Sequence, residues 1–166
     1  MQFNTLPDLT SLSAGQLLRV YGDILEELRR RSIVRSANNP VADVAEDLVA
    51  RALGLERAPP STTGYDCEGP DGRRYEVKAV RQTENNRRTQ LSAIRGLPEK
   101  HFHFLVGVRF ASDFSVSRAA LIPYDVVVAH ARFVKHSNSW LLHLRDSIWD
   151  LPGVEDITAK IKQVQS

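Results

Sequence analysis

The stretch that decides the fold is GYDCEGPDGRRYEVKA, residues 64–79. Its middle, residues 68–72, reads Glu-Gly-Pro-Asp-Gly, and such a run of turn-forming residues joins antiparallel strands. We therefore expect a β-hairpin with strands over 62–67 and 73–80. The hairpin marks the point where the chain changes from helical to strand periodicity.

Side-chain alternation divides this predicted hairpin into an apolar face and a charged face. The apolar face, which we expect to meet the core, carries Tyr65, Cys67, Tyr75, Val77 and Ala79. The opposite face carries Asp66, Glu76 and Lys78. Two converging carboxylates make a hard oxygen site suited to Mg²⁺, and an ammonium beside them can orient water or stabilise charge on phosphorus.

The remaining elements follow from hydrophobic spacing and from turn residues. Apolar residues at helical spacing predict helices over 13–31 and 41–53, with Ser13 capping the first and Gly54 ending the second. Further along the chain we expect strands over 102–110, 116–122 and 140–144, and helices over 123–133 and 157–164. This order predicts an α/β protein with a mixed central β-sheet flanked by helices.

The charged face carries a resemblance to a known family. Asp66, followed across a hairpin turn by Glu76-Val77-Lys78, resembles the PD-(D/E)XK motif of the restriction-endonuclease-like nucleases. Tyr65 stands where that family often has a Pro. The resemblance covers roughly residues 41–122, although the helix that the family places after the Lys strand is not evident over 81–100.

The predicted helix over 41–53 resembles the first core helix of that family, which often carries an acid that completes the metal site. Glu46 lies at the edge of its apolar stripe, whereas we expect Asp43, Asp47 and Arg51 on the outer side. The resemblance therefore assigns the third acid to Glu46.

The resemblance implies a restriction-endonuclease-like core and a Mg²⁺-dependent DNA endonuclease, of restriction type or in DNA processing, which in this family often acts as a homodimer. The implied catalytic residues are Glu46, Asp66, Glu76 and Lys78. Asp66, Glu76 and Glu46 would bind the metal. Lys78 would position or activate the attacking water.

The charge distribution bears on a nucleic-acid partner. The net charge is only +2, which excludes a bulk polybasic binder, yet in residues 73–100 the basic side chains outnumber the acidic ones by five. Within this segment we expect nucleic-acid contacts from Arg81, Arg87, Arg88 and Gln90. Of the 22 basic residues all but five are Arg, which suits phosphate binding, but a GC-rich genome produces the same excess.

The same charged residues also allow interpretations without catalysis. The hairpin charges also fit a solvated strand face with a surface ion pair, and Glu46 fits an ordinary helix-surface acid. The fold would equally suit a nucleic-acid-binding or protein-interaction subunit without catalysis. His101 and His103 would share one side of a strand, and we interpret them as structural because no acid cluster is evident beside them.

Length and composition set the organisation. A chain of 166 residues predicts a single domain, with a helical extension over 1–37, a catalytic core over 38–123 and helix and strand elements over 124–166. The single Cys67 excludes an intramolecular disulfide. No apolar run approaches the roughly 20 residues of a membrane span, and no secretory signal is evident, so we expect a cytoplasmic protein without membrane partners.

Overall fold

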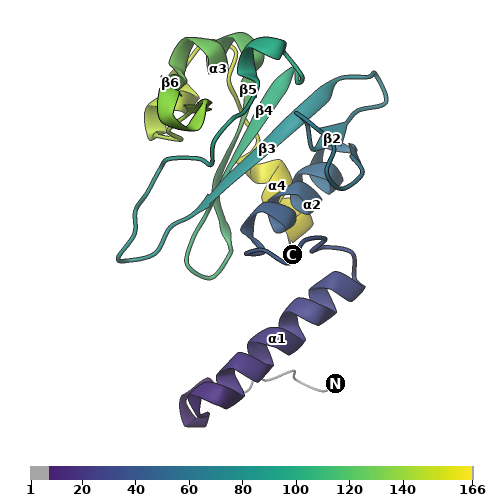
Figure 1. Cartoon of the computed structure of the whole chain (residues 1–166), viewed down its shortest axis with the longest axis vertical. Helices are drawn as coiled ribbons and strands as arrows, with labels where there is room; N and C mark the ends of the chain where they lie inside the picture. The colour runs from purple at the N-terminus through teal and green to yellow at the C-terminus, as the bar shows by residue number, and fades with distance from the viewer. Residues whose placement is uncertain (1–7, 166) are drawn as a thin grey trace. The chain divides into compact units, whose positions relative to one another are not determined.

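The computed structural model describes residues 8–165, and within them it shows an α/β protein with a six-stranded mixed sheet (Figure 1). The described α-helices are α1 (Ala14–Arg30), α2 (Val41–Leu53), α3 (Tyr124–His130) and α4 (Thr158–Gln165). The sheet contains β1 (Glu56–Arg57), β2 (Cys67–Glu68), β3 (Arg74–Arg81), β4 (Phe104–Phe110), β5 (Val116–Pro123) and β8 (Glu155–Asp156). A separate hairpin pairs β6 (Arg132–Val134) with β7 (Ser139–Leu141). No helix in this part of the chain is long and apolar enough to cross a membrane.

Contacts within the chain divide it after Pro40 into two compact units. The first contains α1, whose start is closed by a capping box. The Gln16 N–H donates to the Ser13 hydroxyl, and the Ser13 N–H donates to the Gln16 side chain. Because this exchange satisfies N–H groups that a helix leaves unpaired, it sets the helix start that the sequence predicts.

The second unit is built on the sheet, with strand order β1-β2-β3-β4-β5-β8. Only β3 and β4 run parallel, with Val77 beside Val106 and Lys78 beside Gly107. The other neighbours are antiparallel. A parallel pair needs a crossover to bring the chain back to the same end of the sheet, and residues 82–103 provide it.

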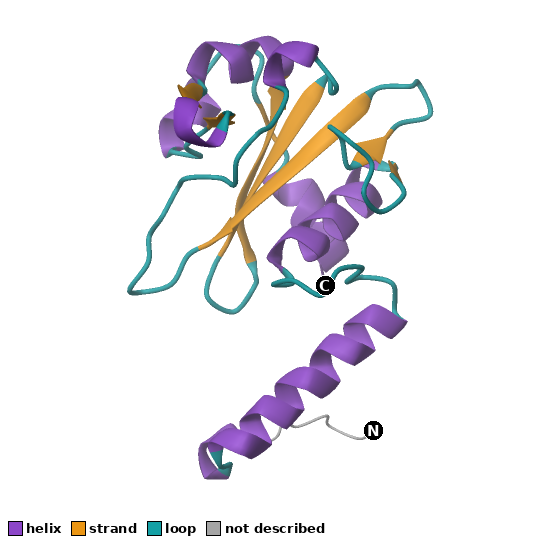
Figure 2. Ribbon diagram, viewed as in Figure 1, coloured by secondary structure: helices purple, strands orange, loops and turns teal. Residues whose placement is uncertain are grey.

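Apolar side chains cover both faces of this sheet. Figure 2 shows helices on both sides of it. On one face α2 and α4 pack on the apolar side of the hairpin, around Ala45, Val49, Cys67, Val77 and Ile161. On the other face α3, the 3-10 helix Asp146–Asp150 and the crossover form a second cluster, which includes Leu91, Ile94, Leu105, Leu144 and Ile148. The predicted core face of β3 is therefore confirmed, and its charged face lies beside a second core. Tyr65, which the sequence predicts on the same face as Cys67, packs against that second core instead.

Several element boundaries differ from the predictions. The strand expected over 62–67 is reduced to Cys67–Glu68, because Ser61 and Gly64 have positive φ angles of 68° and 87° that bend the chain. The helix expected over 123–133 ends at His130, and β6 follows it. The strand expected over 140–144 is the shorter β7, Ser139–Leu141.

The crossover contains no α-helix, only the 3-10 turn Leu97–Glu99. The crossover is nevertheless held to the segment 140–142 by backbone hydrogen bonds. Ile94 and Trp140 exchange two backbone hydrogen bonds of 2.8 Å, and the Leu91 N–H donates to the Leu142 carbonyl at 2.9 Å. Leu91, Ile94 and Leu97 are at most 2% exposed, so the crossover closes the second face of the sheet.

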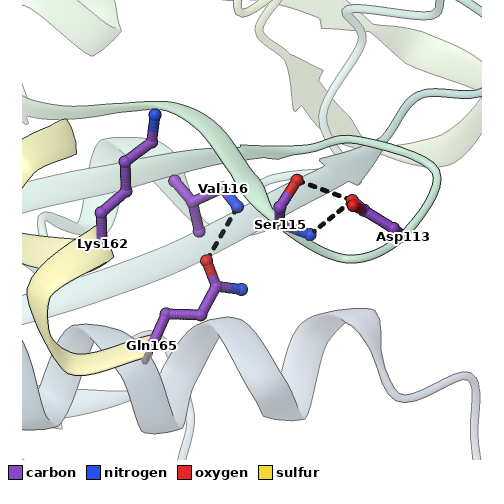
Figure 3. A pocket seen from close by; sticks show the side chains of 5 residues that line it. All are labelled: Asp113, Ser115, Val116, Lys162 and Gln165. Carbon is purple, nitrogen blue, oxygen red and sulfur yellow. Dashed lines mark hydrogen bonds between the residues drawn. The ribbon is translucent and has the colours of Figure 1, made fainter. Parts of the chain in front are cut away.

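Gln165 of α4 clamps the turn between β4 and β5 (Figure 3). Its Oε1 accepts a hydrogen bond from the Val116 N–H at 2.9 Å, and its Nε2 donates to the Phe114 carbonyl at 2.6 Å. Phe114 needs such support because it has a positive φ of 65°.

We expect Gln165→Ala to lower the free energy of unfolding by about 1–3 kcal/mol, because two partly buried backbone groups lose their partner. Denaturant unfolding measures the loss. Lys162→Ala is the control, since it truncates a neighbour on the same helix and leaves both bonds of Gln165 in place. An equal loss in the two variants would contradict this clamp.

Candidate active site

Asp66 lies directly before β2, and its carboxylate reaches β3. The Val77 N–H donates to Asp66 Oδ2 at 2.7 Å. The Asp66 main chain is held on both sides, because its N–H donates to the Tyr75 carbonyl and its carbonyl accepts from the Ala58 N–H, both at 2.8 Å. The position of the carboxylate is therefore set by β3 and by the segment after β1.

Glu76 and Lys78 both lie on β3, two residues apart, so their side chains are on the same face of the sheet. Lys78 Nζ lies 2.6 Å from Glu76 Oε1, and the two side chains are only 16% and 11% exposed. Their neighbours on β4 are Leu105 and Gly107, both in the interior of the sheet. Because little water reaches this ion pair, its charges are screened less than those of a surface pair.

The electrostatics of Asp66 indicate that the carboxylates converge. Burial, and after it the negative charge of Glu76, raise the pKa of Asp66 to about 7, and Glu46 contributes in the same direction. The Val77 N–H and the Lys78 ammonium act the other way. The structure thus brings Asp66, Glu46, Glu76 and Lys78 into one electrostatic neighbourhood, the grouping that the sequence predicts.

Glu46 also has a partner that the sequence does not reveal. Arg57, on β1, places its guanidinium 3.2 Å from Glu46 Oε2, 3.8 Å from Asp43 Oδ1 and 3.9 Å from Asp47 Oδ1. The expectation that Asp43 lies on the outer side of the helix is wrong, because Asp43 is only 7% exposed. The single positive charge of Arg57 thus offsets part of the negative charge of these three acids of α2.

The carboxylates of this site are candidate ligands for a metal ion. Among residues 8–165 no group of three or more His, Cys, Asp or Glu side chains is arranged to hold one. Mg²⁺, however, is commonly bound through one or two carboxylates and keeps several waters. Asp66 and Glu76 fit this mode, because the pKa of Asp66 is raised by burial and then by the negative charge of Glu76, and a cation bound to both carboxylates would offset that repulsion.

A pocket of about 430 Å³ opens beside Glu76 and Lys78. Its remaining lining comes from the segment before Asp66 and from the crossover: Thr63, Gly64, Ala93, Arg95, Gly96, Glu99 and His101. Arg95, Glu99 and His101 are not among the site residues that the sequence predicts. Their neighbourhood depends on the path of an irregular crossover, which no hydrophobic period predicts.

His101 packs against the segment that leads to Asp66. Its Nε2 lies 2.7 Å from Glu99 Oε2, and a Cβ placed on Gly64 would come within 2.4 Å of the His101 Cβ. His103 lies elsewhere, where its Nδ1 accepts from the Arg74 N–H at 3.0 Å. The expectation that the two His share one strand face is therefore wrong, because both precede β4.

The predicted nucleic-acid contacts lie outside the lining of this pocket. The Arg81 guanidinium donates to the Ser112 carbonyl and stacks over the Phe114 ring, 4.5 Å from its centroid. Arg87 and Arg88 are exposed on the loop after β3, and their carbonyls accept hydrogen bonds from Gln82 Nε2. Gln90 forms a β-bridge with His143.

Comparison with known proteins adds no family. No protein-family model matches the chain, and no curated protein matches it.

We expect Asp66→Asn to stabilise the protein at alkaline pH in the presence of a chelator. An acid whose pKa rises on folding binds its proton more tightly in the native state, so stability falls as the pH rises from about 4 toward the native pKa of about 7. Asn removes this penalty and retains an oxygen for the Val77 N–H. The gain in the free energy of unfolding reaches up to about 4 kcal/mol above pH ~8 and vanishes below pH ~4. Parallel pH profiles for the two proteins would contradict the burial of this charge.

We expect Gly64→Ala to lower the free energy of unfolding by about 1–3 kcal/mol more than Gly72→Ala. Both glycines have positive φ angles, 87° and 75°, but only the Cβ at position 64 would collide with His101, since nothing lies within 4 Å of a Cβ at position 72. Denaturant unfolding of both variants isolates the collision. Equal losses would mean that Gly64 is needed for its φ angle alone.

Proposed function

We propose that this protein is a Mg²⁺-dependent phosphodiester hydrolase acting on DNA, with Asp66, Glu76 and Lys78 as its catalytic residues and Glu46 as a supporting acid. The observation that carries the proposal is the convergence of two shielded carboxylates beside a shielded ammonium. Glu76 raises the pKa of Asp66, and Lys78 Nζ lies 2.6 Å from Glu76 Oε1. A solvated strand face would leave these charges screened by water and independent of one another.

The arrangement resembles the PD-(D/E)XK nucleases, with the acids and the lysine on the two arms of one hairpin. The resemblance extends this proposal to a restriction-endonuclease-like core and to action as a homodimer. In support, α2 precedes the hairpin in the chain and packs on β3, which agrees with the chain order that the resemblance implies for the first core helix. The crossover, which contains a 3-10 turn and no α-helix, departs from the family pattern.

Each residue would have a distinct task. Asp66 and Glu76 would hold the cation, which when bound polarises a phosphoryl oxygen and lowers the pKa of a coordinated water. Lys78 would donate hydrogen bonds to the attacking water or to the charge that develops on the phosphoryl oxygens. In the reaction, the oxygen of water bonds to phosphorus, the ester P–O bond breaks, and the leaving oxygen takes up a proton.

Glu46 would act through charge. Its carboxylate adds to the negative potential at Asp66, and Arg57 limits that potential by lying 3.2 Å from Glu46 Oε2. The pair would set how strongly the site attracts a cation.

A second candidate is a nucleic-acid-binding subunit on the same fold without catalysis. The observation that favours it is the absence, within residues 8–165, of any group of three side chains arranged to hold a metal ion. The Lys78–Glu76 ion pair would then serve structure alone.

Incubation of the purified protein with plasmid DNA and Mg²⁺ or Mn²⁺ tests the proposal. We expect cleavage by the unaltered protein and a loss of at least about 100-fold in rate for Lys78→Ala and for Asp66→Asn, since each removes a group that acts in the transition state. Asp150→Asn and Lys135→Ala are the matched controls, because they change exposed residues outside the pocket.

A thermal shift separates the two candidates. Mg²⁺ that binds the native state raises the melting temperature, and Asp66→Asn should abolish the rise. A protein that binds DNA but neither cleaves it nor responds to Mg²⁺ or Mn²⁺ would be the non-catalytic subunit.

A further inference from the structure

The charges that line the pocket beside Glu76 and Lys78 are almost all matched within the protein. Lys78 pairs with Glu76 at 2.6 Å, and Glu99 Oε2 lies 2.7 Å from His101 Nε2. Arg95 differs from them. Within residues 8–165 its side chain forms no ion pair, hydrogen bond or ring contact. The pocket therefore contains one uncompensated cation.

The other cations of the basic segment 73–100 are mostly committed elsewhere. Arg81 is bonded to Ser112, Arg74 stacks over Tyr65 and Lys100 over Tyr124. Arg87 and Arg88 are exposed without side-chain bonds among residues 8–165, but they do not line this pocket. Arg95 is the cation of this segment that is both uncommitted and located beside the carboxylates.

The backbone that presents Arg95 is fixed on both sides. The preceding Ile94 is 1% exposed and exchanges two backbone hydrogen bonds of 2.8 Å with Trp140. The following Gly96 has a φ of 60°, its carbonyl accepts from the Glu99 N–H at 3.0 Å, and a Cβ on it would lie 2.5 Å from Glu99 Oε2. Because the main chain at Arg95 is already ordered, binding of a ligand by this arginine costs side-chain entropy but little backbone entropy.

We propose that Arg95 is the phosphate-binding residue of this pocket and holds a backbone phosphate of the nucleic-acid substrate opposite Glu76 and Lys78. The inference rests on the proposed function for the identity of the substrate. A guanidinium donates two parallel hydrogen bonds to a phosphate, and an uncompensated one attracts that anion into a pocket whose carboxylates would otherwise repel it. Arg95 thus positions the phosphodiester, while the chemistry belongs to the hairpin residues.

The test measures DNA binding without catalysis. The full chain is titrated against a short fluorescein-labelled DNA duplex in EDTA, by anisotropy, over a series of NaCl concentrations. We expect Arg95→Gln to weaken binding by about 3- to 10-fold at moderate salt and to reduce the slope of log K against log [NaCl] by about 0.9, the effect of one phosphate contact. Arg132→Gln, which removes an exposed arginine outside this pocket, is the matched control and should change neither quantity.

The outcomes separate this inference from the proposed function. Equal affinities and slopes for Arg95→Gln, Arg132→Gln and the unaltered chain would overturn the role of Arg95, even if plasmid cleavage is intact. Equal losses in both variants would also overturn it, because the effect would then reflect overall charge. Arg95-dependent binding without cleavage in Mg²⁺ would leave this inference standing and refute the hydrolase. Absence of any DNA binding by the unaltered chain would refute the phosphate-binding role of Arg95.

Discussion

The hydrogen bond from the Val77 N–H to the Asp66 carboxylate, 2.7 Å long, is the interaction on which the candidate site depends. It ties the segment before β2 to the central strand β3, and it holds one carboxylate close enough to Glu76 that their charges interact. The Asp66 main chain is held by its own hydrogen bonds to Tyr75 and Ala58, so the Val77 bond is the one that fixes the direction of the carboxylate. The same bond offsets part of the cost of a carboxylate shielded from water, because an N–H donor favours the charged form.

The parallel pairing of β3 with β4 has a second consequence. It requires a crossover, and that crossover returns over the charged face of β3, where it closes a second hydrophobic core and builds the far wall of the pocket. Glu76 and Lys78 are thereby moved from a solvated strand surface into a partly closed site. The functional proposals for the hairpin and for Arg95 both follow from this one topological requirement.

The faces of β3 and the bounds of α2 could be predicted from the sequence, because both depend on residues that are close along the chain. Alternation in β3 placed Val77 toward the core and Glu76 and Lys78 on the other face, and hydrophobic spacing predicted α2 within its observed bounds. The errors arose where tertiary contacts compete with local preference. Asp43 is on the polar side of its helix by spacing, yet it is buried because Arg57, from a two-residue strand without a sequence signal, lies against it. His101 and His103 do not share a strand face, because β4 begins after both of them.

The sequence by itself determined the hairpin, the two faces of its central strand and the set of charged residues gathered there, because turn chemistry and the two-residue period of a strand depend only on neighbours along the chain. The tertiary structure alone decided which distant residues join them. Arg57 meets Glu46, His101 packs on Gly64, and Arg95 shares a pocket with Lys78 only after the sheet and its crossover have formed. Those contacts depend on the path of irregular backbone held by long-range hydrogen bonds, which carries no periodic pattern in the sequence.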